Sequence, residues 1–139
     1  MAQGMTIAQL SPGMTAELSH TVTEADIQGF ARVTGDTNPV HMDEAYAQAS
    51  MFKGRIAHGM LSAGFISAVL GTKLPGPGAI YMSQSMFFKA PVRIGDTVVT
   101  RVTVKEVIAD KKRVKLDTVC LVNDKPVLEG EALLMVPAA

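Results

Sequence analysis

The sequence has little cysteine, few aromatic residues and no net charge. Its 139 residues include one cysteine, Cys120, and no tryptophan, and aromatic residues make up 5% of the chain. One cysteine cannot form an internal disulfide, and Cys120 lies in an apolar run that favours a small buried side chain. Thirteen basic and thirteen acidic residues cancel, which gives no attraction for a polyanion. We therefore expect neither a disulfide scaffold nor a nucleic-acid partner.

Long hydrophobic runs are also missing. The longest mostly apolar stretch, residues 57–70, is shorter than the roughly 20 residues that a membrane-spanning helix needs, and it contains His58, Ser62 and Ser67. The N-terminal residues lack the basic segment and long apolar stretch of a secretory signal. The sequence therefore predicts a cytoplasmic protein with no membrane contact, in which residues 57–70 form a buried helix.

The length is typical of one domain, so we expect a single domain over residues 1–139. Hydrophobic periodicity, caps and turns predict elements in this order: a strand at 15–22, a helix at 24–34 capped by Thr23, a loop at 36–41, a short helix at 43–49 capped by Asp43, the buried helix at 57–70 ended by Gly71, and strands at 80–88, 97–108, 113–122 and 127–136. This order predicts an α+β fold with a largely antiparallel sheet of about five strands wrapped around one long central helix. Pairing of an exposed edge strand with a second copy predicts a homodimer.

One dense group of titratable and turn residues occurs at positions 36–41. Asp36 and His41 lie five residues apart, and the Asn-Pro turn between them lets both side chains face one small volume that could hold a water molecule. A carboxylate and an imidazole at such a place suit proton transfer. The spacing alone is more typical of a structural turn, in which Asp36 caps backbone N–H groups and His41 packs.

A second element begins the predicted central helix. Gly59 lies where free N–H groups and the positive end of the helix dipole attract an anion, and a glycine leaves room for close approach. This position could hold an oxyanion. Taken alone, Gly59 equally fits close packing of the helix, and the neighbouring His58 is typical of a core histidine with satisfied hydrogen bonds.

Three segments together resemble a known family. The runs TGDxNPVHxD (residues 34–43), GRIAHGML (54–61) and FFKAPVRIGD (87–96) are similar, in order and spacing, to the MaoC-like (R)-specific enoyl-CoA hydratases, and the resemblance extends over residues 15–136. It implies a hot dog fold and a homodimer. It also implies reversible syn hydration of a trans-2-enoyl-CoA to an (R)-3-hydroxyacyl-CoA, with no metal or redox cofactor.

The resemblance assigns roles to individual residues. It implies that Asp36 and His41 are the catalytic pair, that Asn38 shapes the site, and that the backbone N–H of Gly59 binds the thioester oxygen. Which member of the pair acts as the base stays open, because a coupled pair titrates as a unit. The family's helix serine falls on Ser67, which either supports the catalytic loop or bonds back to the preceding turn of its helix.

The coenzyme A phosphates suggest basic residues at the mouth of the site. Candidates are Arg55, Lys89 and residues 111–113, although a solvated surface charge also fits each of them. The acyl chain needs an apolar pocket, for which Phe65 and Leu70 of the central helix are candidate limits on chain length.

Other functions of the same fold remain alternatives. Hot dog dehydratases acting on acyl carrier protein, and many acyl-CoA thioesterases, use a carboxylate on the central helix, and residues 57–70 contain no Asp or Glu. A non-catalytic acyl-CoA-binding module is the third alternative, and it is the better interpretation if the protein binds CoA esters without converting them.

Overall fold

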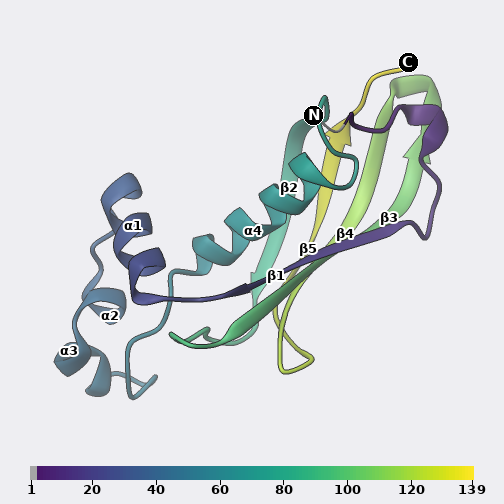
Figure 1. The fold of residues 1–139 in the computed structure, drawn as a ribbon. Coiled ribbons are helices and arrows are strands. Elements are labelled where there is room, and N and C mark those ends of the chain that lie inside the picture. Colours follow the sequence, from purple (N-terminus) through teal and green to yellow (C-terminus); the bar gives the residue numbers. More distant parts are fainter. Residues whose placement is uncertain (1–2) are drawn as a thin grey trace.

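The computed structural model describes residues 3–139, in which five antiparallel strands form one sheet (Figure 1). The strand order is β1-β3-β4-β5-β2. The elements are β1 (Thr15–Thr21), α1 (Glu24–Thr34), α2 (Pro39–Met42), α3 (Glu44–Gln48), α4 (Gly59–Thr72), β2 (Ile80–Phe88), β3 (Thr97–Ile108), β4 (Arg113–Val122) and β5 (Lys125–Met135), with short 3-10 turns at Ile7–Gln9 and Ala109–Lys111. The predicted α+β class and largely antiparallel sheet are confirmed.

The alternating sequence of β3 and β4 explains how the sheet acquires an apolar and a polar face. Successive side chains of a strand point to opposite faces, and Val102, Val104 and Leu116 are fully buried on one of them. The other face carries cross-strand ion pairs such as Lys115 with Glu106. The apolar face therefore needs a covering element.

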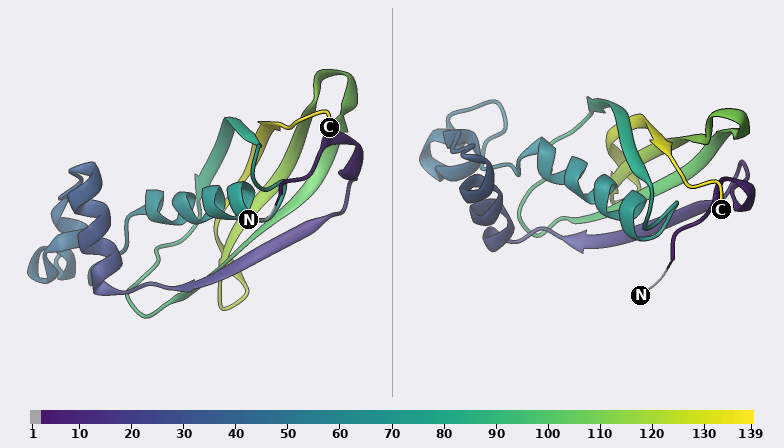
Figure 2. Two further views of the ribbon diagram at one scale, coloured as in Figure 1. Left: turned by 45° about the horizontal axis from the view of Figure 1, so that its top comes forward. Right: turned by 90° about the horizontal axis from the view of Figure 1, so that it is seen from above.

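Helix α4 covers that face. Its side chains Ile66, Val69 and Leu70 have at most 1% of their surface exposed, and the helix packs mainly on β3, with further contacts to β1 and β4. Figure 2 shows α4 running along the sheet between the two edge strands, β1 and β2. Cys120 is buried in the same core, where burial raises the pKa of its thiol. No helix in residues 3–139 has both the length and the apolar content to cross a membrane.

The segment α1–α3 lies beyond the N-terminal end of α4 (Figures 1 and 2). Thr23 caps α1 by accepting a hydrogen bond from the Asp26 N–H, and Gly35 ends the helix in the left-handed region at φ 80°. Asp43 caps α3 through the Tyr46 N–H. The predicted caps of both helices and the bounds of α1 are confirmed, whereas α3 ends at Gln48, one residue before the predicted end. Because Gly35 reverses the chain, residues 36–42 turn back toward the head of α4.

Three sequence-based predictions are wrong in detail. The predicted loop at 36–41 contains the short helix α2, because Pro39 at its first position has a fixed φ that suits a helix start. Helix α4 begins at Gly59, two residues late, since the Ala57 N–H donates to the Val92 carbonyl at 2.7 Å and keeps that segment extended. Gly71 does not end α4, which continues to Thr72.

Candidate active site

The catalytic loop predicted from the sequence is shaped by local hydrogen bonds. The Asp36 N–H donates to the Thr34 hydroxyl at 3.1 Å, and the Asn38 N–H donates to the Asp36 carboxylate at 3.2 Å. Asn38 then caps α2 by accepting from the Val40 N–H at 3.1 Å. Asn38 therefore has a definite structural role, which is to begin the short helix that carries His41.

The position of His41 is fixed by its place on the short helix α2 and by a hydrogen bond at one ring nitrogen. The side chain is 9% exposed on α2, and Nδ1 lies 2.9 Å from the Ile56 carbonyl oxygen. Because a carbonyl only accepts hydrogen bonds, Nδ1 carries the proton in this arrangement. The second nitrogen, Nε2, is then free to accept a proton or to bond to a water molecule.

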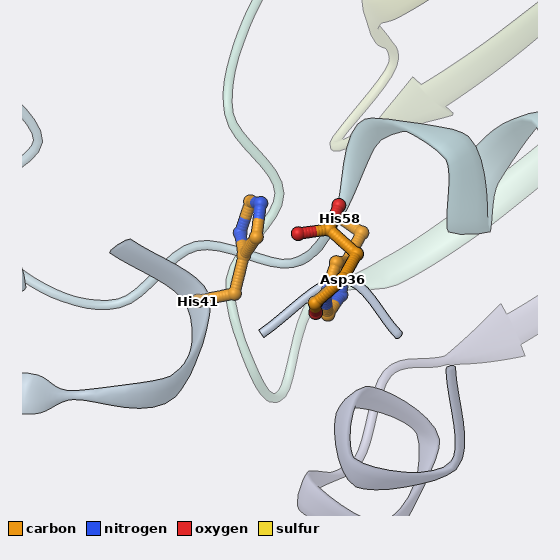
Figure 3. A group of neighbouring side chains, drawn as sticks. All are labelled: Asp36, His41 and His58. Atoms are coloured by element: carbon orange, nitrogen blue, oxygen red, sulfur yellow. The ribbon is translucent and has the colours of Figure 1, made fainter. Parts of the chain in front are cut away.

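The structure brings Asp36 and His41 together with a third side chain, His58. One side-chain oxygen or nitrogen from each of the three lies within 4.8 Å of the others. Figure 3 shows the Asp36 carboxylate pointing toward the His41 ring, with His58 beside Asp36. The sequence predicted that the first two would share one volume, and it treated His58 as an ordinary core residue.

A metal ion would find only part of a ligand set here. His58 Nε2 lies 2.9 Å from the Asp36 carbonyl oxygen, and Nδ1 is shielded from solvent. The lone pairs that face outward therefore come from Asp36 and His41. Structural zinc sites take four protein ligands and catalytic ones three, so this arrangement fits a bound water better than an ion.

A cavity of about 530 Å³ opens beside these groups. Asp36, His41 and Gly59 line it together, and most of the remaining wall is apolar, including Phe88 and Val127. Such a volume is typical of a small-molecule site with a few convergent polar groups. The polar groups converge at the head of α4.

Gly59 supplies a donor at that point. It is the first residue of α4, so its N–H belongs to the turn that has no intrahelical partner, at the positive end of the helix dipole. A Cβ placed on Gly59 would lie 2.6 Å from Cε1 of Phe88. Glycine at this position therefore leaves the Phe88 ring in place and keeps the N–H accessible.

Arg55, a candidate for binding coenzyme A, makes its hydrogen bonds within the chain itself. Its Nη1 and Nη2 donate to the Glu24 carboxylate at 2.7 and 2.8 Å, and its Nε donates to the His41 carbonyl at 2.7 Å. The guanidinium, with 14% of the side chain exposed, holds the pKa of Glu24 down to about 2. These bonds leave Arg55 poorly placed to contact a coenzyme A phosphate. Through them, Arg55 connects α1 to α2.

The other basic candidates separate into two groups. Lys89 lines the cavity, has half of its side chain exposed, and lies 3.7 Å from the Glu129 carboxylate. Residues 111–113 form the β3–β4 turn, which Figure 1 places at the far end of the sheet from α2. Within one chain, therefore, only Lys89 of these candidates is positioned at the mouth.

Three candidates on α4 lie outside the cavity wall formed by residues 3–139. Leu70 is 1% exposed within the core, and the Phe65 ring packs against His20 with centroids 4.7 Å apart. Ser67 is exposed on the outer side of the helix. The structure does not bring Phe65 and Leu70 to the cavity or Ser67 to the catalytic loop, because the residues of α4 near the site are those of its first turn.

Sequence reasoning missed several residues of the cavity wall. Met51, Phe52, Ser62 and Phe88 line it, and Met51 is 85% exposed at the mouth. A Met-Phe pair within a short, otherwise polar connection was an available signal. Phe88 gave no such signal, because its place at the end of an alternating strand fits an ordinary packing role.

Comparison with known proteins agrees with this geometry. The family described as MaoC like domain matches residues 8–127. The chain is 60% identical over 129 residues to the (R)-specific enoyl-CoA hydratase of Rhodospirillum rubrum, covering 93% of this chain and 90% of that protein. It is 52% identical to the 3-hydroxybutyryl-CoA dehydratase of Methylorubrum extorquens over 128 residues, which cover 92% of this chain and 82% of that protein.

A solved structure supports the same assignment. The unliganded R-hydratase PhaJ1 of Pseudomonas aeruginosa superimposes with a TM-score of 0.91 at 44% identity, covering 98% of this chain and 88% of that one. The family match, the related sequences and the superposition all point to the same assignment. The chain therefore belongs to the MaoC-like family and has its hot dog fold.

Proposed function

We propose that this protein is an (R)-specific enoyl-CoA hydratase, which reversibly adds water across a trans-2-enoyl-CoA to give an (R)-3-hydroxyacyl-CoA. The observation that carries this proposal is the meeting of the Asp36 carboxylate and the His41 ring beside the first N–H of α4, on one cavity wall. The names of the related hydratase and dehydratase support the same hydro-lyase reaction.

The chemistry follows from these three groups. Asp36 and His41 hold one water molecule, and the pair removes a proton as the water oxygen bonds to the β-carbon. The electrons of the double bond move toward the thioester oxygen, where the Gly59 N–H stabilises the negative charge. The pair then returns a proton to the α-carbon on the same face, which completes syn addition.

The remaining cavity fits a thioester. Its apolar walls suit the acyl chain, and the exposed Lys89 ammonium at the mouth suits a phosphate of coenzyme A. Addition of water forms one C–O and one C–H bond without net oxidation of the substrate, so the reaction needs no redox cofactor. We place this reaction in the cytoplasm, which agrees with a free, buried Cys120.

Crotonyl-CoA tests the activity directly, because hydration removes the ultraviolet absorbance of the conjugated thioester. We expect loss of absorbance, an R-configured product and no free thiol. Asp36→Asn keeps the acceptor for the Asn38 N–H, and His41→Asn keeps a donor for the Ile56 carbonyl. Each variant should lose about 10²- to 10⁴-fold in kcat while its melting temperature stays near that of the wild type. Release of free thiol would instead indicate a thioesterase, and binding without turnover a non-catalytic module.

We also propose that the protein forms a homodimer through β2. This strand is an edge of the sheet, and it exposes large apolar side chains, among them Ile80 (59%), Met82 (41%) and Phe87 (71%). An unpaired edge with such side chains is a pairing surface. The opposite edge, β1, carries mostly polar residues. A second copy pairing at β2 would lie next to Phe88 and so complete the mouth of the cavity.

Sedimentation velocity tests this dimer. The wild type should sediment as a dimer at micromolar concentration, and Met82→Lys, which places two like charges near the two-fold axis, should shift it toward monomer. Ser19→Lys on β1 is the matched control and should leave the dimer intact. A monomeric wild type, or equal dissociation of both variants, would contradict the β2 interface.

A further inference from the structure

His58 is a buried polar side chain that the proposed mechanism leaves without a role. It is the residue before α4, with 2% of its surface exposed and no side-chain bond to the helix. Its ring lies between two others, 4.6 Å from the centroid of Phe30 and 4.1 Å from that of His41. Burying a polar imidazole costs free energy unless its nitrogens are hydrogen-bonded, so the contacts of His58 call for an explanation.

The hydrogen bonds of His58 select one tautomer. Nε2 lies 2.9 Å from the Asp36 carbonyl oxygen, which can only accept, so Nε2 carries the proton. Nδ1 is shielded from solvent and has no hydrogen-bond partner among residues 3–139. A proton placed on Nδ1 would be a buried donor without an acceptor, which costs more than a bare lone pair. These contacts favour the tautomer with its proton on Nε2, and that donor is directed at the backbone of Asp36.

That bond reaches farther along the chain than the others of the catalytic loop. Within residues 3–139, the other hydrogen bonds made by the backbone of residues 35–38 join groups within four positions of one another. The bond from His58 spans 22 residues. It therefore ties Asp36 to the head of α4, where the next residue in sequence is Gly59.

The same ring also limits where His41 can lie. The Ile56 carbonyl fixes Nδ1 of His41, and the face of His58, 4.1 Å away, supports the ring from one side. One side chain thus touches both members of the catalytic pair and is bonded to the residue that supplies the oxyanion donor.

We propose that His58 is a positioning residue of this active site: its Nε2–H holds the Asp36 backbone, and its ring supports His41 at the distance from Gly59 that the reaction needs. This inference rests on the proposed hydratase function. It predicts that loss of the donor lowers kcat while KM changes little, because a misplacement of about 1 Å can cost roughly 10²-fold in rate.

Two variants separate the donor from the ring. His58→Gln keeps an N–H group at the position of Nε2 and removes the ring, whereas His58→Phe keeps a ring and removes the donor. With crotonyl-CoA, we expect His58→Phe to lose about 10²-fold in kcat with KM within about threefold of the wild type, and His58→Gln to recover most of that loss. His20→Gln, at an exposed histidine outside the cavity, is the control and should keep kcat.

Nitrogen-15 NMR of the wild-type protein tests the tautomer without any turnover. The long-range proton–nitrogen pattern of His58 should show a protonated Nε2 and a bare Nδ1, and this result is independent of whether the protein is a hydratase. The proposal is overturned if Nδ1 carries the proton, if His58→Phe retains wild-type kcat, or if both variants lose kcat equally. If crotonyl-CoA is not hydrated by the wild type, the function fails, and the NMR result still decides how His58 holds Asp36.

Discussion

Gly59→Ala is the most informative single change, because it adds one methyl group at the proposed oxyanion donor. The added Cβ would lie 2.6 and 2.9 Å from Cε1 and Cδ1 of Phe88. The ring must therefore move back by roughly 1 Å to regain ordinary contact. Within one chain, Phe88 is 55% exposed on the edge strand β2, so its ring has room to move away from the added methyl group. Alanine also suits a helix better than glycine, by up to about 1 kcal/mol.

Stability and activity should therefore change in opposite directions. The methyl group stands where the thioester oxygen has to approach the Gly59 N–H, and loss of one such donor costs about 10²- to 10³-fold in kcat. We expect Gly59→Ala to melt at or above the wild-type temperature and to lose about 10²-fold in kcat with crotonyl-CoA.

The double variant Gly59→Ala/Phe88→Ala identifies the cause. If the methyl group itself blocks the donor, as we reason, truncating the displaced ring will not restore kcat. Gly29→Ala is the control, because a Cβ on Gly29 in α1 meets open space. Wild-type kcat in Gly59→Ala, or full recovery in the double variant, would refute the role of this N–H.

Two further predictions concern stability. Glu24→Gln breaks the ion pair with Arg55; because the pKa of Glu24 is lowered from 4.5 to about 2, the pair stabilises the fold above pH 4.5 and loses its effect as the pH falls toward 2. Urea unfolding of wild type and variant should thus differ at pH 7, by less than about 1 kcal/mol for so exposed a carboxylate, and converge near pH 2; a gap that widens in acid contradicts this. Gly130→Ala puts a Cβ 1.8 Å from the Ser85 carbonyl oxygen, which pushes β2 away from β5 and should lower the free energy of unfolding by about 3 kcal/mol in the same assay. The control Gly29→Ala should raise it by up to about 1 kcal/mol. An unchanged urea midpoint for Gly130→Ala would show that the two strands move apart without cost.

The fold was largely predictable because its signals are local. Caps such as Thr23 and Asp43 act within three residues, and the alternation of apolar and polar residues in β3 and β4 is visible in consecutive positions of the sequence. One wrong detail, the start of α4, came from a longer-range effect. Ala57 is of a residue type that favours helices. Its N–H nevertheless donates to the carbonyl of Val92, which lies 35 residues away in sequence, and that contact delays the start of α4.

The site shows the same division between local and distant contacts. The approach of Asp36 to His41 was predictable, since a six-residue turn contains both. The role of Arg55 was not, because the choice between a coenzyme phosphate and Glu24 depends on where α1 lies, 31 residues earlier in sequence. A basic residue near a predicted site is expected to bind substrate only if no carboxylate of the chain reaches it first. Here the carboxylate reaches it: the guanidinium of Arg55 bonds to Glu24 and to the His41 carbonyl, so its charge joins α1 to α2.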